Sequence, residues 1–235
     1  MGPECRRVTR VTSGPTLDTA TAVDAIAELA GRNDRVVVGL TGPPATGKST
    51  AADVLARGCR ERGLRTVIAP MDGFHLAQAV LDERGWRPVK GAPHTFDAVG
   101  YVELLARIRR GGEQTGKHIG DDIGQDTVWA PAFDRSLEEP IAGSIPIAPD
   151  TQVVLTEGNY LLLADRPWRE VPGLLDAIWY VETPDELRRE RLIERHRSYG
   201  RSVAEATQRA LGSDERNAVL VRSTRERADA ILLLP

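Results

Sequence analysis

Short apolar runs recur along the chain, and mixed polar and apolar segments of helical length separate them. Five of these runs predict buried strands, because their β-branched and aliphatic residues leave neither strand face polar. The runs are residues 35–41, 65–70, 152–157, 177–182 and 230–235. Strands that alternate with helices predict an α/β fold in which a five-stranded parallel sheet is flanked by helices.

Helix start signals lie between the predicted strands. Thr183 followed by Pro184 predicts a capping threonine with proline in the first helical turn. A glycine pair at 111–112 predicts the end of a helix that starts near residue 98. The other predicted caps or starts are Asp97, Ser202 with Glu205, and Ser213.

Residues 84–150 interrupt the alternation of strands and helices. The segment is rich in Gly, Pro, Asp and Thr, and it contains one clear helix and two possible short strands near 127–131 and 144–149. Long irregular segments in compact domains are usually functional or disordered, so we interpret this one as an acceptor-binding insertion. The polar stretch 113–127 inside it fits no motif.

Length and composition favour one globular domain over residues 1–235. The chain is 41% hydrophobic and has no apolar run near the ~18 residues that a membrane span needs. No apolar segment follows the basic residues at the N-terminus, so we expect a cytoplasmic protein without a secretory signal. A net charge of −3 argues against a nucleic-acid binder, and the spacing of the two cysteines and four histidines argues against a structural zinc. The sequence is also compatible with a homodimer.

The stretch GPPATGKST, residues 42–50, directly follows the first predicted strand. It fits the phosphate-binding pattern G-x-x-x-x-G-K-[ST] in the required context, between a strand and a helix. Such a loop turns backbone N–H groups toward phosphates, its lysine reaches the β- and γ-phosphates, and Ser49 can bind Mg²⁺. The alternative is a chance match in a glycine-rich turn. The predicted nucleotide contacts are Gly42, Ala45, Thr46, Gly47, Lys48, Ser49 and Thr50.

Two acidic residues follow other predicted strands. Asp72 lies in APMDGFH and Glu157 ends VVLTE. Because ligands bind at the carboxyl ends of parallel strands, Asp72 is a candidate base for an attacking hydroxyl and Glu157 a candidate Mg²⁺ ligand that also borders the substrate. The alternatives are an aspartate in an ordinary turn with Gly73 and a solvated glutamate at a strand end.

The segment 188–201 is rich in arginine and predicts a helix. Such a run is usually a solvated face, but it also suits a lid that closes over a triphosphate. Arg191 and Arg195 are four residues apart and can share one helix face. We take Arg191 as a catalytic candidate, and Arg195 and Arg201 as nucleotide contacts.

Two further stretches, KGAPHTFD and WAPAFDR, place aromatic and polar residues in the insertion. Aromatic walls with a few polar groups are typical of small-molecule pockets. The alternative is that Phe96 and Phe133 only anchor the insertion. Together with Asp72 and Glu157, the candidate substrate contacts are His75, Lys90, His94, Phe96, Phe133 and Arg135.

Taken together, these motifs resemble the P-loop kinases of the uridine kinase, phosphoribulokinase and bacterial pantothenate kinase group. The resemblance is carried by GPPATGKST, MDGFH, EGNYLLL and RRERLIERHRSYGR, and it spans about residues 35–234. The stretches KGAPHTFD and FDRSLEEPIAG resemble the branch of nucleoside/nucleotide kinases often called fructokinase-like. The tyrosine-rich substrate stretch of uridine kinases is missing, and Arg195 stands where their lids often have an acid.

This resemblance implies an ATP- and Mg²⁺-dependent kinase that phosphorylates a hydroxyl of a small molecule, a sugar or a nucleoside. It also implies that MDGFH holds the catalytic aspartate, and that Arg191 and Arg201 are lid arginines. A pantothenate kinase-like activity and a non-catalytic ATP-binding regulatory protein are the alternatives.

Overall fold

The computed structural model describes residues 14–112 and 127–234. Two sequence-based expectations concern residues outside these ranges: the missing secretory signal at the N-terminus and, apart from Thr127, the polar stretch 113–127. Within the described ranges, no helix has the length and apolar character needed to cross a membrane.

A six-stranded parallel sheet forms the centre of the fold, in the order β1-β8-β7-β2-β6-β3. All five predicted strands are present, and the sheet has one more strand than predicted. The added strand, β1, has only two residues and pairs Thr16 with Ile231, so it is too short to give an apolar run. The bounds are β1 Thr16–Leu17, β2 Val36–Thr41, β3 Thr66–Ile68, β6 Val153–Gly158, β7 Ala177–Glu182 and β8 Ala230–Leu233.

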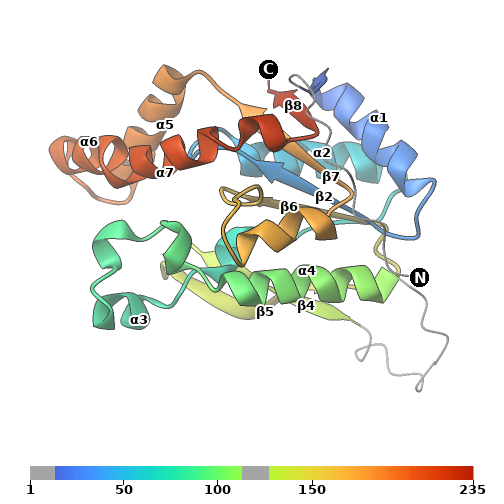
Figure 1. Cartoon of the computed structure of the whole chain (residues 1–235), viewed down its shortest axis with the longest axis horizontal. Coiled ribbons are helices and arrows are strands. Elements are labelled where there is room, and N and C mark those ends of the chain that lie inside the picture. Colours follow the sequence, from blue (N-terminus) through green and yellow to red (C-terminus); the bar gives the residue numbers. More distant parts are fainter. Residues whose placement is uncertain (1–13, 113–126, 235) are drawn as a thin grey trace.

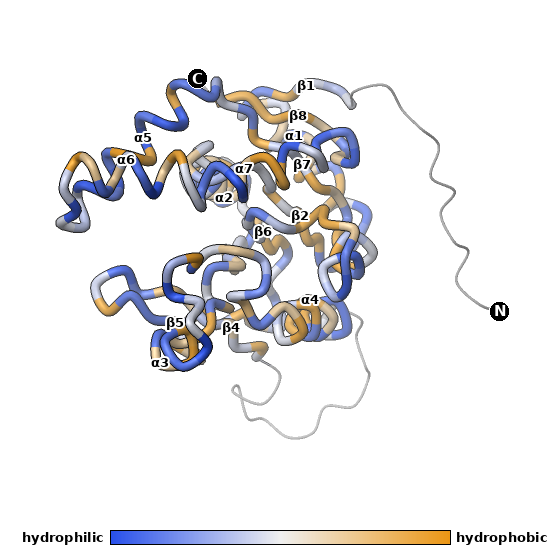
Figure 2. Tube along the Cα trace, turned by 60° about the vertical axis from the view of Figure 1, so that its left-hand side comes forward, coloured by the Kyte–Doolittle hydropathy of each residue, from blue (hydrophilic) through white to orange (hydrophobic). Residues whose placement is uncertain are grey.

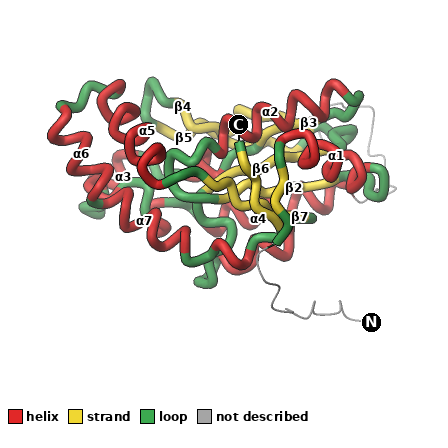
Figure 3. The backbone as a smooth tube through the Cα atoms, turned by 90° about the horizontal axis from the view of Figure 1, so that it is seen from above, coloured by secondary structure: helices red, strands yellow, loops and turns green. Residues whose placement is uncertain are grey.

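Helices cover both faces of this sheet (Figures 1 and 3). On one face, α1 (Thr19–Ala30) and α2 (Lys48–Glu61) pack on Val36, Val38 and Leu40 of β2. Val37 points to the opposite face and joins the cluster that includes α4 (Ala98–Gly112) and the 3-10 helix η4 (Trp168–Leu174). Every residue of β2 and β6 is buried, and apart from their C-terminal ends these two central strands are apolar (Figure 2).

The predicted insertion contains α4 and a two-stranded antiparallel hairpin, β4 (Val128–Asp134) and β5 (Glu139–Ile147). Both strands are longer than the predicted ones, and a bulge interrupts the register between Ala130 and Ala132. The hairpin packs on the 3-10 helix η1 (Met71–Phe74). A Cβ atom at Gly73 would lie 2.3 Å from the Pro131 carbonyl oxygen, so this close approach requires glycine. The remaining short elements are α3 (Gln78–Glu83), η2 (Arg87–Val89) and η3 (Pro93–Thr95).

Three helices, α5 (Asp185–Ser198), α6 (Val203–Leu211) and α7 (Ser213–Arg222), follow β7 and lie together at one end of the molecule (Figure 1). A short 3-10 turn, η5 (Arg225–Arg227), follows α7. Ser202 and Glu205 form the predicted capping box, and Asp97 Oδ1 accepts a hydrogen bond of 2.8 Å from Gly100 N. The predicted cap at Thr183 is wrong, because α5 has no side-chain cap and the Thr183 hydroxyl donates to the Thr46 carbonyl instead.

Candidate active site

The P-loop connects the end of β2 to the start of α2. Gly47 precedes α2 with φ of 89°, a left-handed conformation that glycine adopts without strain. No side chain caps α2, so its first N–H groups remain available to an anion. Ala45 also has a positive φ, 67°, although it carries a Cβ. Such strain in a non-glycine residue is found mainly at functional sites.

Lys48 is buried at the start of α2, and its Nζ donates to the Pro43 carbonyl at 3.0 Å. Burial lowers the pKa of Lys48 to about 8, while the negative charges of Glu157 and Asp72 act in the opposite direction. The loop therefore places one ammonium group beside two carboxylates. A phosphate group would supply a further negative charge to this poorly solvated cation.

Ser49 and Glu157 meet in front of the P-loop. The Ser49 hydroxyl donates to Glu157 Oε1 at 3.0 Å, although the two residues lie on different elements, α2 and β6. Burial and the charge of Asp72 raise the pKa of Glu157, whereas Lys48 and the Ser49 hydrogen bond lower it. A hydroxyl and a carboxylate are ligands that suit Mg²⁺, which binds through one or two carboxylates together with phosphates and water. The described residues contain no cluster of three or more acidic, histidine or cysteine side chains that could hold a metal without a ligand such as phosphate.

Asp72 lies in η1, directly after β3, as the topology predicts. Its Oδ2 accepts a hydrogen bond of 3.2 Å from Arg135 Nη2 of the hairpin. The electrostatic effect of Asp72 on both Lys48 and Glu157 indicates that all three groups share one region. Strand ends β2, β3 and β6 thus bring a lysine, an aspartate and a glutamate together, as expected for the carboxyl edge of a parallel sheet.

Three predicted substrate contacts, His75, Lys90 and Arg135, surround the ring of a fourth, Phe133, beside Asp72. The His75 ring lies 4.8 Å from the Phe133 ring, centroid to centroid. Lys90 Nζ and the Arg135 guanidinium carbon lie 5.0 Å and 5.7 Å from the centroid of the same ring. The Phe96 ring packs on the His75 ring, with 4.1 Å between their centroids. These side chains border Asp72 on the side of the hairpin.

The arginines of α5 differ in their surroundings. A Cβ atom at Gly47 would lie 4.0 Å from Arg191 Nη1, so Arg191 reaches the P-loop. Burial is the main cause of the lowered pKa of Lys48, and the positive charges of Arg195 and Arg188 lower it further. Arg201 instead contacts His196, with 2.7 Å between Arg201 Nη1 and His196 Nδ1. The structure therefore brings Arg191 and Arg195 toward the P-loop and holds Arg201 against His196.

Two residues near the P-loop were not among the predicted contacts. Thr183 donates to the Thr46 carbonyl at 2.9 Å and ties the start of α5 to the loop. Arg188 is fully buried, and its Nη1 has no hydrogen-bond partner in the described part of the chain. The local pattern suggested a helix cap for Thr183 and a solvated face for Arg188. It gave no signal for the contact of Thr183 with the P-loop or for the burial of Arg188.

A cavity of about 570 Å³ adjoins the P-loop. Pro43 and Thr46 contribute the loop side, and Tyr180, Glu182 and Arg225 contribute the opposite side. Arg225 pairs with Glu182 at 2.8 Å and lies 6.0 Å from the centre of the Tyr180 ring. The cavity has the size of a small-molecule site, and neither Asp72 nor a residue of the hairpin lines it.

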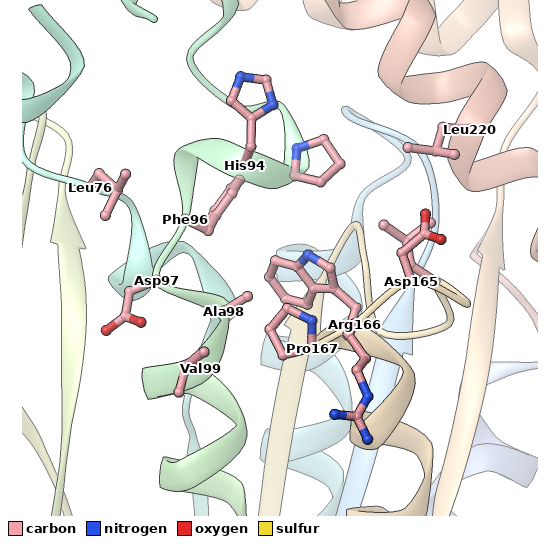
Figure 4. Close-up of a pocket in the computed structure, with 13 residues that line it drawn as sticks. Leu76, His94, Phe96, Asp97, Ala98, Val99, Asp165, Arg166, Pro167 and Leu220 are labelled. Carbon is pink, nitrogen blue, oxygen red and sulfur yellow. The ribbon is translucent and has the colours of Figure 1, made fainter. Parts of the chain in front are cut away.

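A second cavity, of about 560 Å³, is lined by the remaining predicted substrate contact, His94, and also by Phe96 (Figure 4). His94 and Phe96 line it with Trp168 of η4 and Leu220 of α7, and no residue of the P-loop takes part. Phe96 is buried and has the His75 ring as a neighbour, so it separates this cavity from the region of Asp72. His94 packs edge-on against Trp86. The structure thus groups His94 with the second cavity rather than with Asp72.

Known proteins are similar to this chain over most of its length. It is 32% identical over 213 residues to "Putative uridine kinase C227.14" of Schizosaccharomyces pombe, covering 87% of this chain and 86% of that protein. It is 36% identical over 178 residues to the Escherichia coli protein "Uncharacterized protein YggC", covering 73% of this chain and 67% of that protein. A family profile described as "Methylmalonyl Co-A mutase-associated GTPase MeaB" matches residues 5–75, the stretch that includes the P-loop and Asp72.

A solved structure gives the same picture. The crystal structure of a "putative fructose transport system kinase" from Silicibacter sp. TM1040 is 34% identical, with a TM-score of 0.75. The match covers 91% of this chain and 98% of that one. The chain belongs to the uridine kinase-like family of P-loop kinases.

Proposed function

We propose that this protein transfers the γ-phosphoryl group of ATP to a hydroxyl of a small molecule. The observation that carries the proposal is the arrangement of Lys48, Asp72 and Glu157 at three neighbouring strand ends around the P-loop. A non-catalytic nucleotide-binding protein needs the loop and the metal ligands, but it does not need a partly exposed aspartate beside them that the hairpin residue Arg135 contacts.

The P-loop is the proposed binding site for the phosphates of ATP. Backbone N–H groups at the start of α2 donate to phosphate oxygens, and Lys48 neutralises the β- and γ-phosphates. Arg191 and Arg195 of α5 lie on the lid side and stabilise negative charge on the transferring group. Arg201 serves the nucleotide only after it leaves His196. The cavity between Thr46 and Arg225 is large enough for the nucleoside part.

Ser49 and Glu157 are the proposed ligands of Mg²⁺. When bound, the ion offsets the charge of the phosphates and orients them. Glu157 stays ionised there, because a neighbouring cation favours its charged form over the raised pKa that burial causes. The Ser49–Glu157 hydrogen bond holds both ligands in place before the ion arrives.

Asp72 is the proposed base or orienting group for the acceptor hydroxyl. Its carboxylate is partly exposed, next to Arg135, and it lies on the same side as His75 and Phe133. A hydroxyl that donates to Asp72 is thereby held near the phosphates that we propose for the P-loop, and such positioning favours phosphoryl transfer. The names of the relatives suggest a nucleoside or a sugar as the acceptor.

The experiment that tests the proposal is acceptor-dependent ADP release by the purified chain, with sugars, nucleosides, polyols and pantothenate as acceptors. Lys48→Met and Asp72→Asn are each expected to lower kcat/KM by about 10²- to 10⁴-fold. Asp72→Asn is expected to keep most of its affinity for ATP, because in the described part of the chain the Asp72 carboxylate pairs with Arg135 and makes no hydrogen bond or ion pair with residues 42–50.

Slow ADP release that no acceptor accelerates would contradict a phosphotransferase and favour a nucleotide-switch protein. Near-normal turnover by Asp72→Asn would remove Asp72 from the proposed role while leaving the activity itself intact.

A further inference from the structure

Two cations lie on one aromatic ring at the outer edge of the acceptor region. Lys90 Nζ is 5.0 Å and the Arg135 guanidinium carbon 5.7 Å from the centroid of Phe133. We propose that this pair binds an anionic group of the acceptor, a carboxylate or a phosphate monoester, while a hydroxyl of the same molecule meets Asp72. The inference rests on the proposed function and narrows its acceptor to a hydroxylated anion.

Lys90 is a half-buried cation whose ion pair with the Glu138 carboxylate is long, at 3.4 Å. Its side chain is 12% exposed, and its Nζ donates to the Glu138 main-chain carbonyl at 2.8 Å. The Glu138 carboxylate, 51% exposed, and the Gln78 amide oxygen both lie 3.4 Å away. An ammonium group has three donors, and burying its charge costs free energy unless an anion is near. Lys90 therefore has the capacity for a closer anionic partner.

The backbone around Lys90 is fixed by side chains from α6, from α7 and from the loop after β6. Arg209 Nη2 of α6 donates to the Lys90 carbonyl at 3.2 Å. The next carbonyl, that of Gly91, accepts from Asn217 Nδ2 of α7 at 3.2 Å and from the hydroxyl of Tyr160. Lys90 thus sits on an anchored segment, which lowers the entropy cost of holding a ligand group in one place.

Arg135 has donors to spare. In the described part of the chain, its guanidinium makes one hydrogen bond, to Asp72 Oδ2 at 3.2 Å. A guanidinium carries five N–H donors in a plane, and pairs of them match the two oxygens of a carboxylate or phosphate. Arg135 can therefore bind an anion with a second edge of the guanidinium.

His75 completes the site at the hydroxyl end. Its Nδ1 lies 2.8 Å from the Asp72 carbonyl oxygen, which can only accept, so Nδ1 carries the proton. Burial lowers the pKa of His75, so the ring is neutral and its Nε2 is a hydrogen-bond acceptor. The site therefore offers acceptors for hydroxyls at Asp72 and His75 and cations for an anion around Phe133. This combination suits a hydroxy acid, a sugar acid or a sugar phosphate.

The ion pair between Arg135 and Asp72 gives a reason why an anionic acceptor would be preferred to a neutral one. In the acceptor-free protein, Asp72 is partly neutralised by Arg135. An anionic acceptor competes for Arg135 and leaves the Asp72 carboxylate to its own hydroxyl. A neutral acceptor offers Arg135 no such partner, so the ion pair continues to compete with the hydroxyl for Asp72.

The test compares neutral and anionic forms of the same alcohol as acceptors for the full chain with Mg·ATP. Suitable sets are glycerol, glycerate and glycerol 3-phosphate; ribose, ribonate and ribose 5-phosphate; fructose and fructose 6-phosphate; and uridine and uridine 5′-monophosphate. The measured quantity is kcat/KM from acceptor-dependent ADP release. We expect an anionic member to exceed its neutral parent by at least about 10-fold, since a hydrogen bond to a charged group has that effect. The carboxylate and phosphate arms identify the anion.

Variants then assign the preference to the cations. Lys90→Gln and Arg135→Gln are each expected to lower kcat/KM for the anionic acceptor by about 10- to 100-fold, and for its neutral parent by less. Lys90→Arg should keep most of the preference for the anionic acceptor. This variant therefore separates loss of the positive charge from a general effect on folding. Arg84→Gln is the matched control, because Arg84 makes a similar contact, 5.0 Å from the Trp86 ring, outside the site.

Two results would overturn the inference in distinguishable ways. A neutral acceptor that equals or exceeds its anionic partners in every set would refute anion recognition and leave the kinase activity standing. ADP release that no member of any set stimulates, in a protein that binds ATP by calorimetry, would refute the proposed phosphotransfer and the inference with it.

Discussion

Lys48 shows how burial and charge act on a single residue of this site. The ammonium is surrounded by protein, and its hydrogen bond goes to the Pro43 carbonyl at 3.0 Å. Burial lowers the pKa of Lys48 to about 8, even though Glu157 and Asp72 favour the charged form. In the ligand-free protein, this lysine therefore titrates within an accessible pH range.

The lowered pKa of Lys48 predicts an alkaline limit to ATP capture. The protonated lysine binds phosphate, and protonation is lost as pH rises through about 8, so kcat/KM for ATP should fall above that pH. Bound phosphates raise the pKa again, so kcat should fall only at higher pH. Initial-rate profiles from pH 6.5 to 10 measure both limits.

The control for this pH profile is Lys48→Arg, a weaker enzyme whose guanidinium stays charged throughout. It should lack the alkaline limb near pH 8. A wild-type kcat/KM for ATP that stays flat to pH 9.5 would show that Lys48 does not set the limit.

Motif spacing alone was enough to predict some residues of the site, but not others. Lys48 and Ser49 belong to one short pattern, and Glu157 ends a strand whose neighbour is the P-loop strand. The pairing of Arg135 with Asp72 joins residues far apart in sequence, and it depends on how the hairpin packs, which no local pattern encodes. Thr183 carries a helix-cap signal, yet its hydroxyl donates to the Thr46 carbonyl of the P-loop, a contact between segments far apart in sequence that no local pattern encodes.

At the scale of elements, an ion-pair network fixes α5 to α7. Glu215 of α7 binds Arg188 at 2.5 Å, Arg189 at 3.1 Å and Arg222 at 2.8 Å. Burial alone would raise the pKa of Glu215, but the hydrogen bonds from these arginines lower it to about 2. One carboxylate thus holds the base of the arginine-bearing helix that faces the P-loop.

Replacing that carboxylate should loosen the helix. Glu215→Gln is expected to lower the free energy of unfolding by about 2–4 kcal/mol at pH 7, because the buried Arg188 guanidinium then keeps only one of its two carboxylate partners, Asp185. The carboxylate stabilises the fold above its unfolded pKa near 4.5, and this stabilisation is lost as pH falls toward 2. Denaturant titrations at pH 7 and at low pH should therefore show a difference between variant and wild type that shrinks in acid.

Glu194→Gln provides the comparison, since Glu194 also pairs with an arginine on α5, at 2.9 Å, but is 69% exposed. It should cost less than about 1 kcal/mol. Equal effects of the two substitutions would show that the network at Glu215 adds no stability beyond that of a surface pair.

The contact between η1 and the hairpin is a second link between elements. A Cβ atom at position 73 would lie 2.3 Å from the Pro131 carbonyl, so Gly73→Ala must push β4 away from Asp72. We expect a rise in the acceptor KM with little change in the KM for ATP, and a loss of about 1–3 kcal/mol in stability. Steady-state kinetics with both substrates separate these effects.

Gly173→Ala is the matched control, because nothing lies within 4 Å of its Cβ position and its φ is not positive. An acceptor KM that Gly73→Ala leaves unchanged would show that the hairpin does not position the acceptor.

Elements with strong periodic signals were predictable, whereas those stabilised by their partners were not. The five strands with apolar runs are buried on both faces, so their composition identified them. The two-residue strand β1 exists only through its pairing with β8. Strands β4 and β5 include prolines and exposed positions, and they extend further than expected because they pair with each other over a bulge.

At the scale of the whole molecule, the parallel sheet combines two halves of a site. The ends of β2, β3 and β6 position Lys48, Asp72 and Glu157. Because β6 lies between β2 and β3 in the sheet, these three ends are neighbours. The hairpin, which comes from the insertion, adds Phe133 and Arg135 on the side of Asp72. Helix α5, which follows β7, brings Arg191 to the P-loop.

The central claim is that Asp72 directs a bound hydroxyl to a phosphate held by the P-loop. The most direct measurement is acceptor-dependent ADP release by the wild type and by Asp72→Asn, with ATP binding measured on both proteins by calorimetry. The account predicts that an acceptor accelerates ADP release in the wild type, and that Asp72→Asn binds ATP with similar affinity but loses about 10²- to 10⁴-fold of the accelerated rate. ADP release that no acceptor accelerates, or that Asp72→Asn retains in full, would contradict it.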